Sequence, residues 1–221
     1  MNRRMFLTLP PLAAPLLLRA PLSAAPSLPM PQQHLDCFGQ HWLVQEASEW
    51  KVDSGPEGEV LQLSVARPQE ANPRAPVQYA LLESAPLDCF TLDLEVKGLA
   101  AATSLIVVFA WKDPLHFNYV HLSTDSAKAQ PVHNGVFHVY GGDRVRISAQ
   151  EGPASLTDAL KWTPVRIVYD ASKNLVETWI AGQKNPSLRG ADFSLGAGRI
   201  GLGSFFNTGS FRKFALRQGA C

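Results

Sequence analysis

The stretch TLDLEVK, residues Thr91–Lys97, alternates strictly between apolar and polar side chains. Successive side chains of a β-strand point to opposite faces, so its leucines and valine would lie on one face and its polar residues on the other. Arg144–Ser148 repeats the alternation, whereas Leu105–Trp111 is apolar throughout, which is typical of a strand covered on both sides. These three segments predict β-structure with a period of two residues.

Further segments have the same strand character: Val60–Ala66, Val77–Leu82, Phe117–Ser123, Val136–Tyr140, Pro164–Asp170, Leu175–Ala181, Arg199–Ser204 and Ser210–Leu216. Turn sequences such as Gly141-Gly142-Asp143 separate them at short intervals. Only Ser155–Leu160 suggests a helical turn. Roughly ten or eleven short strands joined by turns predict one all-β domain, a sandwich or a barrel.

The composition is that of a globular domain. The chain has 221 residues, of which 46% are hydrophobic, enough to bury the core of one domain of ordinary size. Its formal net charge is +1, from 20 basic and 19 acidic residues. This balance gives no electrostatic footprint for nucleic acid or an anionic membrane, and neither is expected as a partner.

The first 25 residues have the pattern of an export signal, with a positive start, a short apolar stretch and then small residues. Arg3-Arg4 followed by Phe6-Leu7 matches the twin-arginine pattern, and an ordinary secretory signal is the alternative. Both predict a periplasmic or secreted protein whose folded domain spans residues 26–221. Prolines interrupt the apolar stretch, which falls short of the ~20 residues that a permanent membrane span requires.

Three cysteines, Cys37, Cys89 and Cys221, are present. An oxidising compartment would allow one disulfide and leave one thiol. Cys37 and Cys221 lie near the two ends of the expected domain, which often meet in a closed sandwich. The sequence nevertheless leaves all three pairings open, and the spacing of the cysteines is not that of a metal site.

Five phrases follow one another in the second half of the chain: FTLDLEVKG (Phe90–Gly98), FAWKDPLHFNYVHLS (Phe109–Ser123), HNGVFHVYGGDRVRIS (His133–Ser148), WTPVRIVYD (Trp162–Asp170) and GRIGLGSFFNTGSFRKFAL (Gly198–Leu216). From about Leu87 to the C-terminus, this ordered set resembles the concanavalin A-like domain family of 3-keto-disaccharide hydrolases, which is related to laminin-G and family-16 glucanase folds. The resemblance implies an all-β, concanavalin A-like jelly-roll sandwich of two antiparallel sheets, and a carbohydrate ligand or substrate. The glycines of the last phrase, Gly201 and Gly203, can also be explained by structure alone, because glycine in a strand lets another backbone approach closely.

Polar and aromatic residues gather on the strands between Phe109 and Ser148. Alternation places Tyr119 and His121 on the face opposite Asn118, and a short hairpin would join the next two strands. We therefore expect one sheet face to carry Tyr119, His121, His138, Tyr140, Arg144 and Arg146. Aromatic rings stack on sugar rings, while imidazole and guanidinium groups bind hydroxyls. The remaining residues expected to bind substrate are Trp111, Asp113, His116 and Asn134.

Ordinary two-carboxylate glycoside hydrolysis is disfavoured. Retaining enzymes need carboxylates about 5 Å apart, and the Glu-x-Asp-x-x-Glu set of concanavalin A-like glycosidases does not occur. Asp93 and Glu95 share a strand face, but they are more simply interpreted as solvent-facing charges. The resemblance implies another reaction, in which a histidine removes the C2 proton of a 3-keto sugar, the C1 substituent leaves, and an arginine stabilises the enolate.

The residues expected to catalyse this reaction are His121, His133, His138 and Arg146, with Arg144 as an alternative support. Taken singly, each histidine is more simply interpreted as structural. A carbohydrate-binding domain of the lectin type is the alternative function, and a structural or adhesion sandwich without sugar is a third. No cofactor is predicted; a divalent metal at these histidines, with Asp113 or Asp143, stays open because no ligand spacing is diagnostic.

Overall fold

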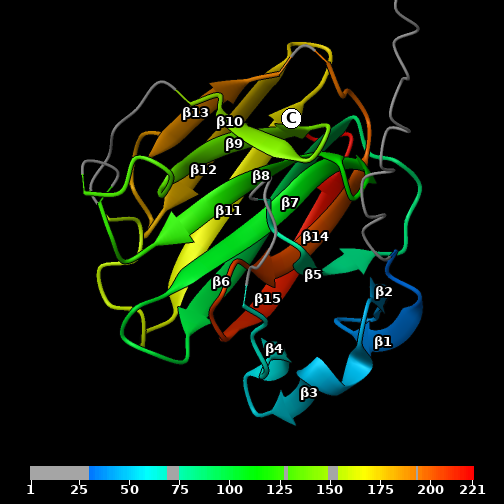
Figure 1. The fold of residues 1–221 in the computed structure, drawn as a ribbon, viewed down its shortest axis with the longest axis vertical. Coiled ribbons are helices and arrows are strands. Elements are labelled where there is room, and N and C mark those ends of the chain that lie inside the picture. The colour runs from blue at the N-terminus through cyan, green and yellow to red at the C-terminus, as the bar shows by residue number, and fades with distance from the viewer. Residues whose placement is uncertain (1–29, 69–74, 127–128, 149–153, 193) are drawn as a thin grey trace, which may run out of the picture.

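The structure is a computed structural model that describes residues 30–68, 75–126, 129–148, 154–192 and 194–221. In these ranges two antiparallel sheets pack face to face, with a short 3-10 helix at Ala47–Glu49 (η1) (Figure 1). No helix in the described ranges is long and apolar enough to cross a membrane. The expected export signal, residues 1–25, lies outside the described residues.

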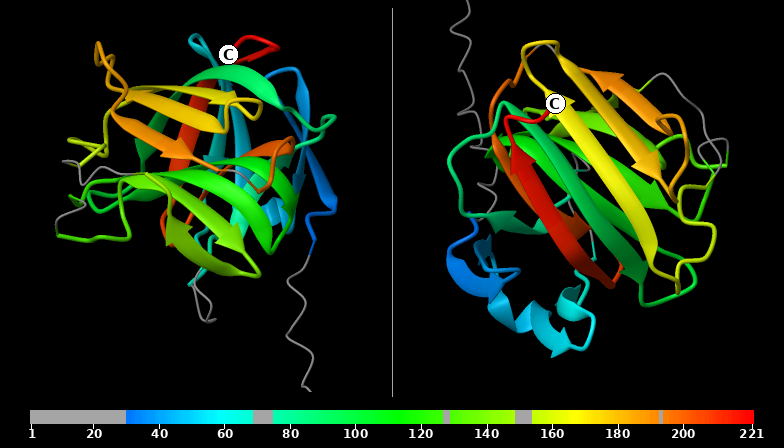
Figure 2. Two further views of the ribbon diagram at one scale, coloured as in Figure 1. Left: turned by 90° about the horizontal axis from the view of Figure 1, so that it is seen from above. Right: turned by 180° about the vertical axis from the view of Figure 1, so that it is seen from behind.

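The strands are distributed between the sheets in a jelly-roll order. The eight-stranded sheet runs β1 (Gln33–Cys37), β2 (Gln40–Val44), β5 (Gln78–Leu82), β14 (Arg199–Ser204), β7 (Ser104–Asp113), β8 (His116–Ser123), β9 (Gly135–Tyr140) and β10 (Asp143–Arg146). The seven-stranded sheet runs β13 (Leu188–Ala191), β12 (Leu175–Ile180), β11 (Thr163–Asp170), β6 (Cys89–Gly98), β15 (Gly209–Gln218), β4 (Gly58–Leu63) and β3 (Trp50–Gly55). The eight-stranded sheet lies in front in Figure 1, and the seven-stranded sheet lies in front in the right-hand view of Figure 2.

All the strands expected from the sequence are present, with ends that differ by a few residues. The structure adds β1, β2, β3 and β13, which are short or largely polar; in β3 only Trp50 is buried. No long apolar alternation marks these strands in the sequence. The helical turn suggested at Ser155–Leu160 is present only at the end of the segment, which otherwise forms bends: the Lys161 amide donates to the Asp158 carbonyl (3.2 Å) in a single turn.

The alternation of Thr91–Lys97 sets the orientation of β6 in the sandwich. Leu92, Leu94 and Val96 are buried between the sheets, while the intervening polar side chains face outward. Each such burial stabilises the fold by about 1.5–3 kcal/mol relative to an exposed side chain. Both faces of β7 are covered, as predicted: Val107 belongs to the core between the sheets, and Val108 to a second apolar cluster on the outer face of the eight-stranded sheet.

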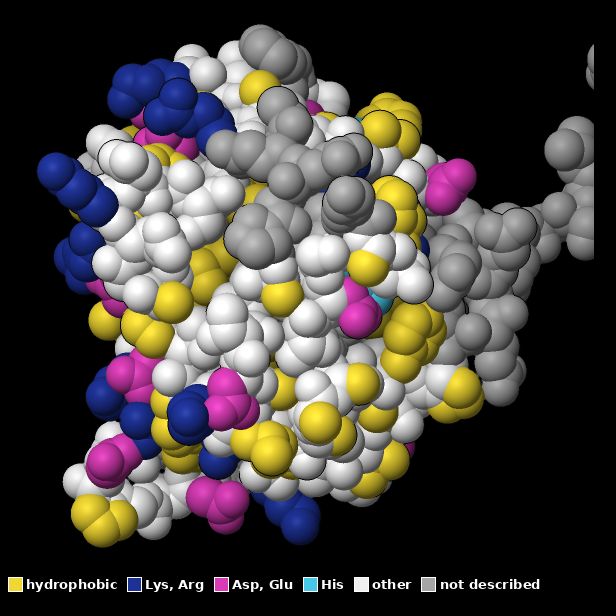
Figure 3. Space-filling model, turned by 90° about the vertical axis from the view of Figure 1, so that its left-hand side faces the viewer, with side chains coloured by type: hydrophobic (Ala, Val, Ile, Leu, Met, Phe, Trp, Pro, Cys, Tyr) yellow, Lys and Arg dark blue, Asp and Glu magenta, His cyan; other side chains and the backbone are white. Residues whose placement is uncertain are grey.

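The outer faces of the two sheets differ in chemistry. The outer face of the eight-stranded sheet is aromatic and apolar, and Tyr79, Phe117 and Phe137 are among its buried residues. The outer face of the seven-stranded sheet carries ion pairs such as Arg166–Asp93. In Figure 3 the lysine and arginine side chains gather along the left of the view, which is the side of the seven-stranded sheet.

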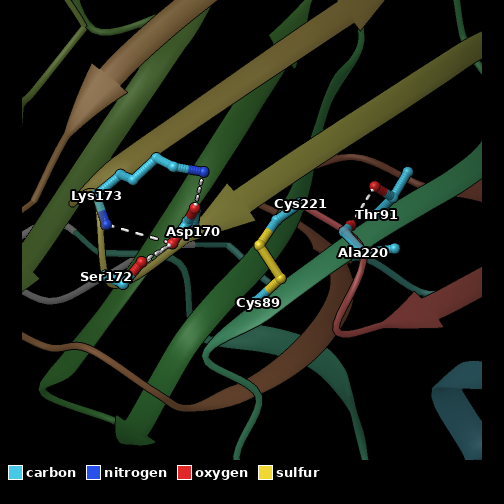
Figure 4. The surroundings of a disulfide bond; sticks show 7 residues. All are labelled: Cys89, Thr91, Asp170, Ser172, Lys173, Ala220 and Cys221. Carbon is cyan, nitrogen blue, oxygen red and sulfur yellow. Dashed lines mark hydrogen bonds and ion pairs between the residues drawn. A yellow bond between two sulfur atoms is a disulfide. The ribbon is translucent and has the colours of Figure 1, made fainter.

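A disulfide joins Cys89, at the start of β6, to Cys221, beyond the end of β15 (Figure 4). Their Cα atoms are 5.5 Å apart, and beside them the Thr91 hydroxyl donates to the Ala220 carbonyl (2.6 Å). Cys37 is a buried free thiol in β1, and burial raises its pKa to about 12. Of the three pairings that the sequence leaves open, the structure therefore has Cys89 with Cys221.

Candidate functional site

The residues expected on a single polar face are divided between the two faces of the eight-stranded sheet. Asn118 in β8 lies opposite His138 in β9, and residues paired in this way point to the same face. His138 and Tyr140 therefore face away from Tyr119 and His121. The expectation of one shared face is wrong, because a register shift of one residue moves every side chain of a strand to the other face.

The outer face keeps most of the expected set. Arg146 lies opposite Phe137 and Arg144 opposite Val139, so both arginines share this face with Tyr119. We name the group they form the Tyr119–His121 cluster; it comprises Tyr119, His121, His133, Phe137, Arg144, Arg146 and Phe205. Its residues come from β8, β9, β10, the loop before β9 and the position directly after β14.

Rings and guanidinium groups are stacked closely in the Tyr119–His121 cluster. The Tyr119 ring stacks on Phe137 at 5.2 Å between centroids, and the His121 ring stacks on Phe205 at 5.0 Å. The Arg144 guanidinium carbon lies 4.6 Å from the centroid of the Phe205 ring. A cation over a partly desolvated ring is attracted by about 0.5–2 kcal/mol, so Arg144 has a defined place above the aromatic layer.

Two buried polar atoms of this cluster lack a hydrogen-bond partner among the described residues, the hydroxyl of Tyr119 and Nε2 of His121. Nδ1 of His121 lies 2.9 Å from the Val132 carbonyl, which identifies Nδ1 as the protonated nitrogen and Nε2 as a free acceptor. Burial, and next the charge on His133, lower the pKa of His121 to about 3. No described group lies in hydrogen-bonding geometry to the Tyr119 hydroxyl. Burial raises the pKa of Tyr119, and the nearby Arg144 partly opposes that rise. An unsatisfied buried polar atom costs about 1–3 kcal/mol, so two together require an explanation.

His133 connects the buried His121 with solvent. The two imidazole rings make an edge-to-face contact at 4.8 Å between centroids. Nδ1 of His133 lies 3.1 Å from the Ser123 hydroxyl and 3.2 Å from a carboxylate oxygen of Asp125, and the His133 side chain is 20% exposed. Neither Ser123 nor Asp125 stands out in the sequence, because both contacts depend on the folding of the loop before β9.

Arg146 and Asn134 hold that loop in place. The Arg146 guanidinium donates to the carbonyls of Pro131 (2.5 Å), His133 (2.5 Å) and Asn134 (2.9 Å). The side-chain oxygen of Asn134 accepts from the Ser123 amide at 2.9 Å, and its backbone has a positive φ of 46°. The sequence predicts a catalytic role for Arg146 and substrate binding for Asn134, whereas in the structure their contacts position His133.

The residues on the inner side form a second group at the rim of the sandwich, which we name the rim cluster; it comprises Asp113, His116, Asn118, His138, Tyr140, Asp192 and Ser194. Nδ1 of His138 donates to the Asn118 side-chain oxygen (2.7 Å), and the Asn118 amide donates to Asp192 (2.7 Å). Nδ1 of His116 lies 2.9 Å from Asp113. The Tyr140 ring contacts both imidazoles, at 4.7 Å from His116, and is 63% exposed.

Trp111 lies apart from both groups, farther along the outer face. Its indole N–H donates to the Tyr79 hydroxyl (3.0 Å), and the Arg199 guanidinium lies 6.0 Å from its ring. Tyr79 contacts Phe117 at 5.7 Å, and Phe117 contacts Tyr119 at 6.2 Å. An aromatic strip therefore runs along the outer face from Trp111 to the Tyr119–His121 cluster.

The candidate metal ligands do not form a cage. Among the described residues, no group of three or more His, Cys, Asp or Glu side chains lies close enough together to hold a metal ion. Asp113 lies with His116 in the rim cluster, whereas His121 and His133 lie on the outer face. The histidines that the sequence groups together thus belong to two separate places in the fold.

No protein-family model matches the sequence, and no curated protein matches it. Solved structures share the fold. The carbohydrate-binding module CBM66 from Bacillus subtilis has a TM-score of 0.57 at 14% identity, over 80% of this chain and 95% of that one. A putative glycosyl hydrolase from Parabacteroides distasonis has a TM-score of 0.55 at 15% identity, over 78% of this chain and 91% of that one. The GH43 protein BlXynB from Bacillus licheniformis has a TM-score of 0.52 at 11% identity, over 84% of this chain and 38% of that one. These similarities establish the concanavalin A-like jelly-roll class of the sandwich.

Proposed function

We propose that the chain is a carbohydrate-binding domain and that it binds through the Tyr119–His121 cluster. The observation that carries the proposal is a pair of buried polar atoms on an aromatic surface, the Tyr119 hydroxyl and His121 Nε2, that have no hydrogen-bond partner in the part of the chain that the structure describes. A sugar hydroxyl can donate to His121 Nε2 and can bond to the Tyr119 hydroxyl, while the apolar face of the ring packs on aromatic carbon. The fold shared with a carbohydrate-binding module supports the same function.

Binding at this place requires a side-chain movement. His121 is 1% exposed and Tyr119 is fully buried, whereas Phe206 at the edge of the cluster is 38% exposed. A sugar would first meet Phe206 and the Arg144 guanidinium, and would reach the two unpartnered atoms when Arg144 turns away from the Phe205 ring. Side-chain rearrangements of this kind are common at binding sites whose backbone does not move.

The test is calorimetric titration with a panel of oligosaccharides against wild type and Tyr119→Phe. Loss of one hydrogen bond is expected to weaken binding about tenfold, because such a bond contributes about 1–1.5 kcal/mol. Tyr140→Phe is the matched control, since Tyr140 lies in the rim cluster. Equal weakening in the two variants, or no binding of any saccharide by wild type, would reject the proposal.

A second candidate function is cleavage of a 3-keto-glycoside, and the contact of His121 with His133 beside Arg144 favours it. With a pKa of about 3, His121 is a weak base near neutral pH. His133, next to Asp125 and partly exposed, is the better base. It would take the proton from C2, the electron pair would pass into the C3 carbonyl as an enolate stabilised by Arg144, and the enolate would then expel the C1 substituent.

Turnover of a 3-keto-glycoside tests this candidate. His133→Ala is expected to lower the rate by a hundredfold or more, in the range of general base catalysis. His138→Ala serves as the control, because His138 lies on the other face of the sheet. If wild type releases no product, the catalytic candidate is rejected while carbohydrate binding stands.

We also propose that the protein is exported to the periplasm or secreted. The twin-arginine pattern at Arg3-Arg4 and the disulfide between Cys89 and Cys221 support this location, because disulfides persist in oxidising compartments. Replacing both arginines by lysine in the full chain is expected to leave the protein in the cytoplasm. Unchanged export of this variant, measured by cell fractionation, would favour the ordinary secretory alternative.

A further inference from the structure

The outer face of the seven-stranded sheet carries a pocket of about 400 Å³, far from the Tyr119–His121 cluster. This sheet lies on the side where lysine and arginine side chains gather, at the left in Figure 3. Its lining comes from β6, β11, β12 and β15 together with the turn after β12; the residues used below are Asp93, Glu95, Arg166, Trp179, Gly182 and Lys213. The two sheets face opposite ways, so this pocket and the Tyr119–His121 cluster share no residue.

Strand register sets the floor of the pocket. Arg166 in β11 lies opposite Trp179 in β12 on one side and opposite Asp93 in β6 on the other. Trp179, Arg166 and Asp93 therefore form one row across three neighbouring strands. Glu95 lies opposite Pro164 in the adjacent row. An indole ring, a guanidinium and two carboxylates thus border one shallow hollow.

The charged groups in this pocket are paired with one another. Arg166 donates to Asp93 through two nitrogens, the closer at 2.6 Å, and Arg217 donates to the same carboxylate at 2.6 Å. Glu95 accepts from Arg212 (2.6 Å) and from Lys213 (2.8 Å). Partial burial opposes ionisation, but these cations hold the pKa of both carboxyl groups below the usual range. The pocket therefore offers fixed donors and acceptors and no unpaired charge among the groups that line it.

The Trp179 ring is partly exposed and differs from the neighbouring Trp162. Two cations lie over the Trp162 ring, the Lys97 ammonium at 4.8 Å and the Arg212 guanidinium at 4.3 Å from its centroid. Trp179 makes no ring or cation contact with any other described residue. An accessible indole beside fixed polar groups is an arrangement that stacks on the apolar face of a sugar ring.

Unusual backbone surrounds the same pocket. Lys213 has a positive φ of 53° at an irregularity in the pairing of β15 with β6, and this turns its ammonium group toward Glu95. In the turn after β12, Ala181 and Gly182 have φ values of 56° and 68°, and Gly182 forms part of the wall. Bulges and residues with positive φ are enriched near binding sites, because they re-aim side chains that regular strands could not place.

We propose that this pocket is a second saccharide site, which holds one ring of a neutral sugar against Trp179, with its hydroxyls bound by Asp93, Arg166 and Glu95. A neutral ligand fits because each charged group of the pocket already has an opposite partner. This proposal does not rest on the proposed function, since the two places have no residue in common. If both hold, the molecule carries sugar sites on opposite faces and can join two polysaccharide chains.

The test uses the indole N–H signals of the isotope-labelled full chain, which has five tryptophans. Trp111 reports on the outer face of the eight-stranded sheet, and Trp179 reports on the pocket. The probes are xylotetraose, cellotetraose and an inulin-type tetrasaccharide, with trigalacturonate as the acidic arm. At least one neutral probe is expected to shift the Trp179 indole signal and the Gly182 amide signal. The affinity obtained by titrating the Gly182 signal is expected to fall at least tenfold in Trp179→Ala.

Three further variants separate this proposal from the other site and from misfolding. Trp179→Tyr, which keeps an aromatic ring, is expected to restore most of the affinity, and Trp162→Phe is the matched control on the same face. Tyr119→Phe is expected to leave the Gly182 shift unchanged. Shifts confined to Trp111, a response to trigalacturonate alone, or no shift at Trp179 with any neutral probe would each overturn the second site.

Discussion

The imidazole of His121 is enclosed by other rings. Its centroid lies 4.8 Å from that of His133, 5.0 Å from that of Phe205 and 6.0 Å from that of Phe137. The Val132 carbonyl occupies its Nδ1 side at 2.9 Å. Protonation at Nε2 would place a charge where the described protein groups offer no acceptor, which is the physical reason why this histidine stays neutral in the fold.

The stability of the protein is expected to fall with pH below 6.5 because of His121. In the folded state its pKa is about 3, against 6.5 for a free histidine, so the unfolded chain binds the extra proton between these values. The contribution of His121 to the free energy of unfolding is complete above pH 6.5. It is lost as the pH falls, and the loss reaches about 2 kcal/mol at pH 5. Urea unfolding at a series of pH values measures this dependence.

His121→Gln should have a flatter pH dependence than wild type between pH 6.5 and pH 4.5, where the carboxylates contribute little. His41→Gln is the control, since His41 lies at the surface with a side chain that is 73% exposed. Equal slopes for wild type and His121→Gln would contradict the assignment of a buried neutral imidazole.

The sequence predicts only some of the residues on the outer face of the eight-stranded sheet. Alternation along β8 correctly separates Tyr119 and His121 from Asn118. It cannot give the register between β8 and β9, on which the position of His138 depends, because a loop joins these strands. Phe205 and Asp192 approach from strands and loops distant in the sequence, so no local pattern indicates that they contact His121 and Asn118.

The glycines of β14 determine how closely its neighbours approach. A Cβ atom on Gly203 would lie 2.3 Å from the Gln78 carbonyl oxygen, which is backbone in β5 and cannot move aside. A Cβ on Gly201 would lie 3.0 Å from the Ala80 carbonyl oxygen. The structure thus confirms the close backbone approach that the Gly-x-Gly pattern predicts.

Gly203→Ala is therefore expected to destabilise the fold by about 1–3 kcal/mol, the usual cost of overpacking, or by more if β5 and β14 separate. Thermal unfolding followed by circular dichroism measures the change. Gly55→Ala is the matched control, because a Cβ on Gly55 would meet nothing within 4 Å. A Gly203→Ala variant as stable as Gly55→Ala would show that β5 can shift without cost.

The strands that the sequence predicts are those that bury apolar side chains in a regular pattern. β6 and β11 alternate clearly because one face of each packs in the core. β1, β3 and β13 lie at or next to the edges of the sheets, where fewer side chains are buried and polar residues are tolerated. Edge strands owe their position to pairing with a neighbour, which a single sequence does not reveal.

At the scale of the molecule, one core holds both sheets together. It extends from Cys37 in β1 to Phe211 in β15, so residues from nearly the whole described chain contribute to it. The outer faces of the sheets do not contribute to this core, and they differ in chemistry. The outer face of the eight-stranded sheet is aromatic, and that of the seven-stranded sheet is rich in ion pairs. The two proposed saccharide sites therefore lie on opposite sides of one sandwich.

Removing the disulfide is expected to destabilise the molecule without changing its fold. Cys89 and Cys221 are separated by 132 residues in sequence, and the loss of a bridge that closes a long loop typically costs about 2–4 kcal/mol. A Cys89→Ser/Cys221→Ser variant, compared with the oxidised wild type in urea unfolding, measures the loss. Unchanged stability would show that the pairing of β15 with β6 and β4 holds it in place without the bridge.

The order of the cysteines along the chain bears on how the molecule acquires its oxidised form. Cys221 follows β15, so the native bridge can close only after all the described strands have been made, whereas Cys37 and Cys89 are available earlier and would close a shorter loop. If Cys37 and Cys89 formed a bridge early, it would have to be exchanged for the native bridge between Cys89 and Cys221. Burial of Cys37 by β1 and β2 would prevent this early bridge. Thiol exchange takes seconds to hours, much longer than strand pairing. The yield of protein with the native Cys89–Cys221 bridge should therefore depend on a disulfide isomerase or on folding before oxidation.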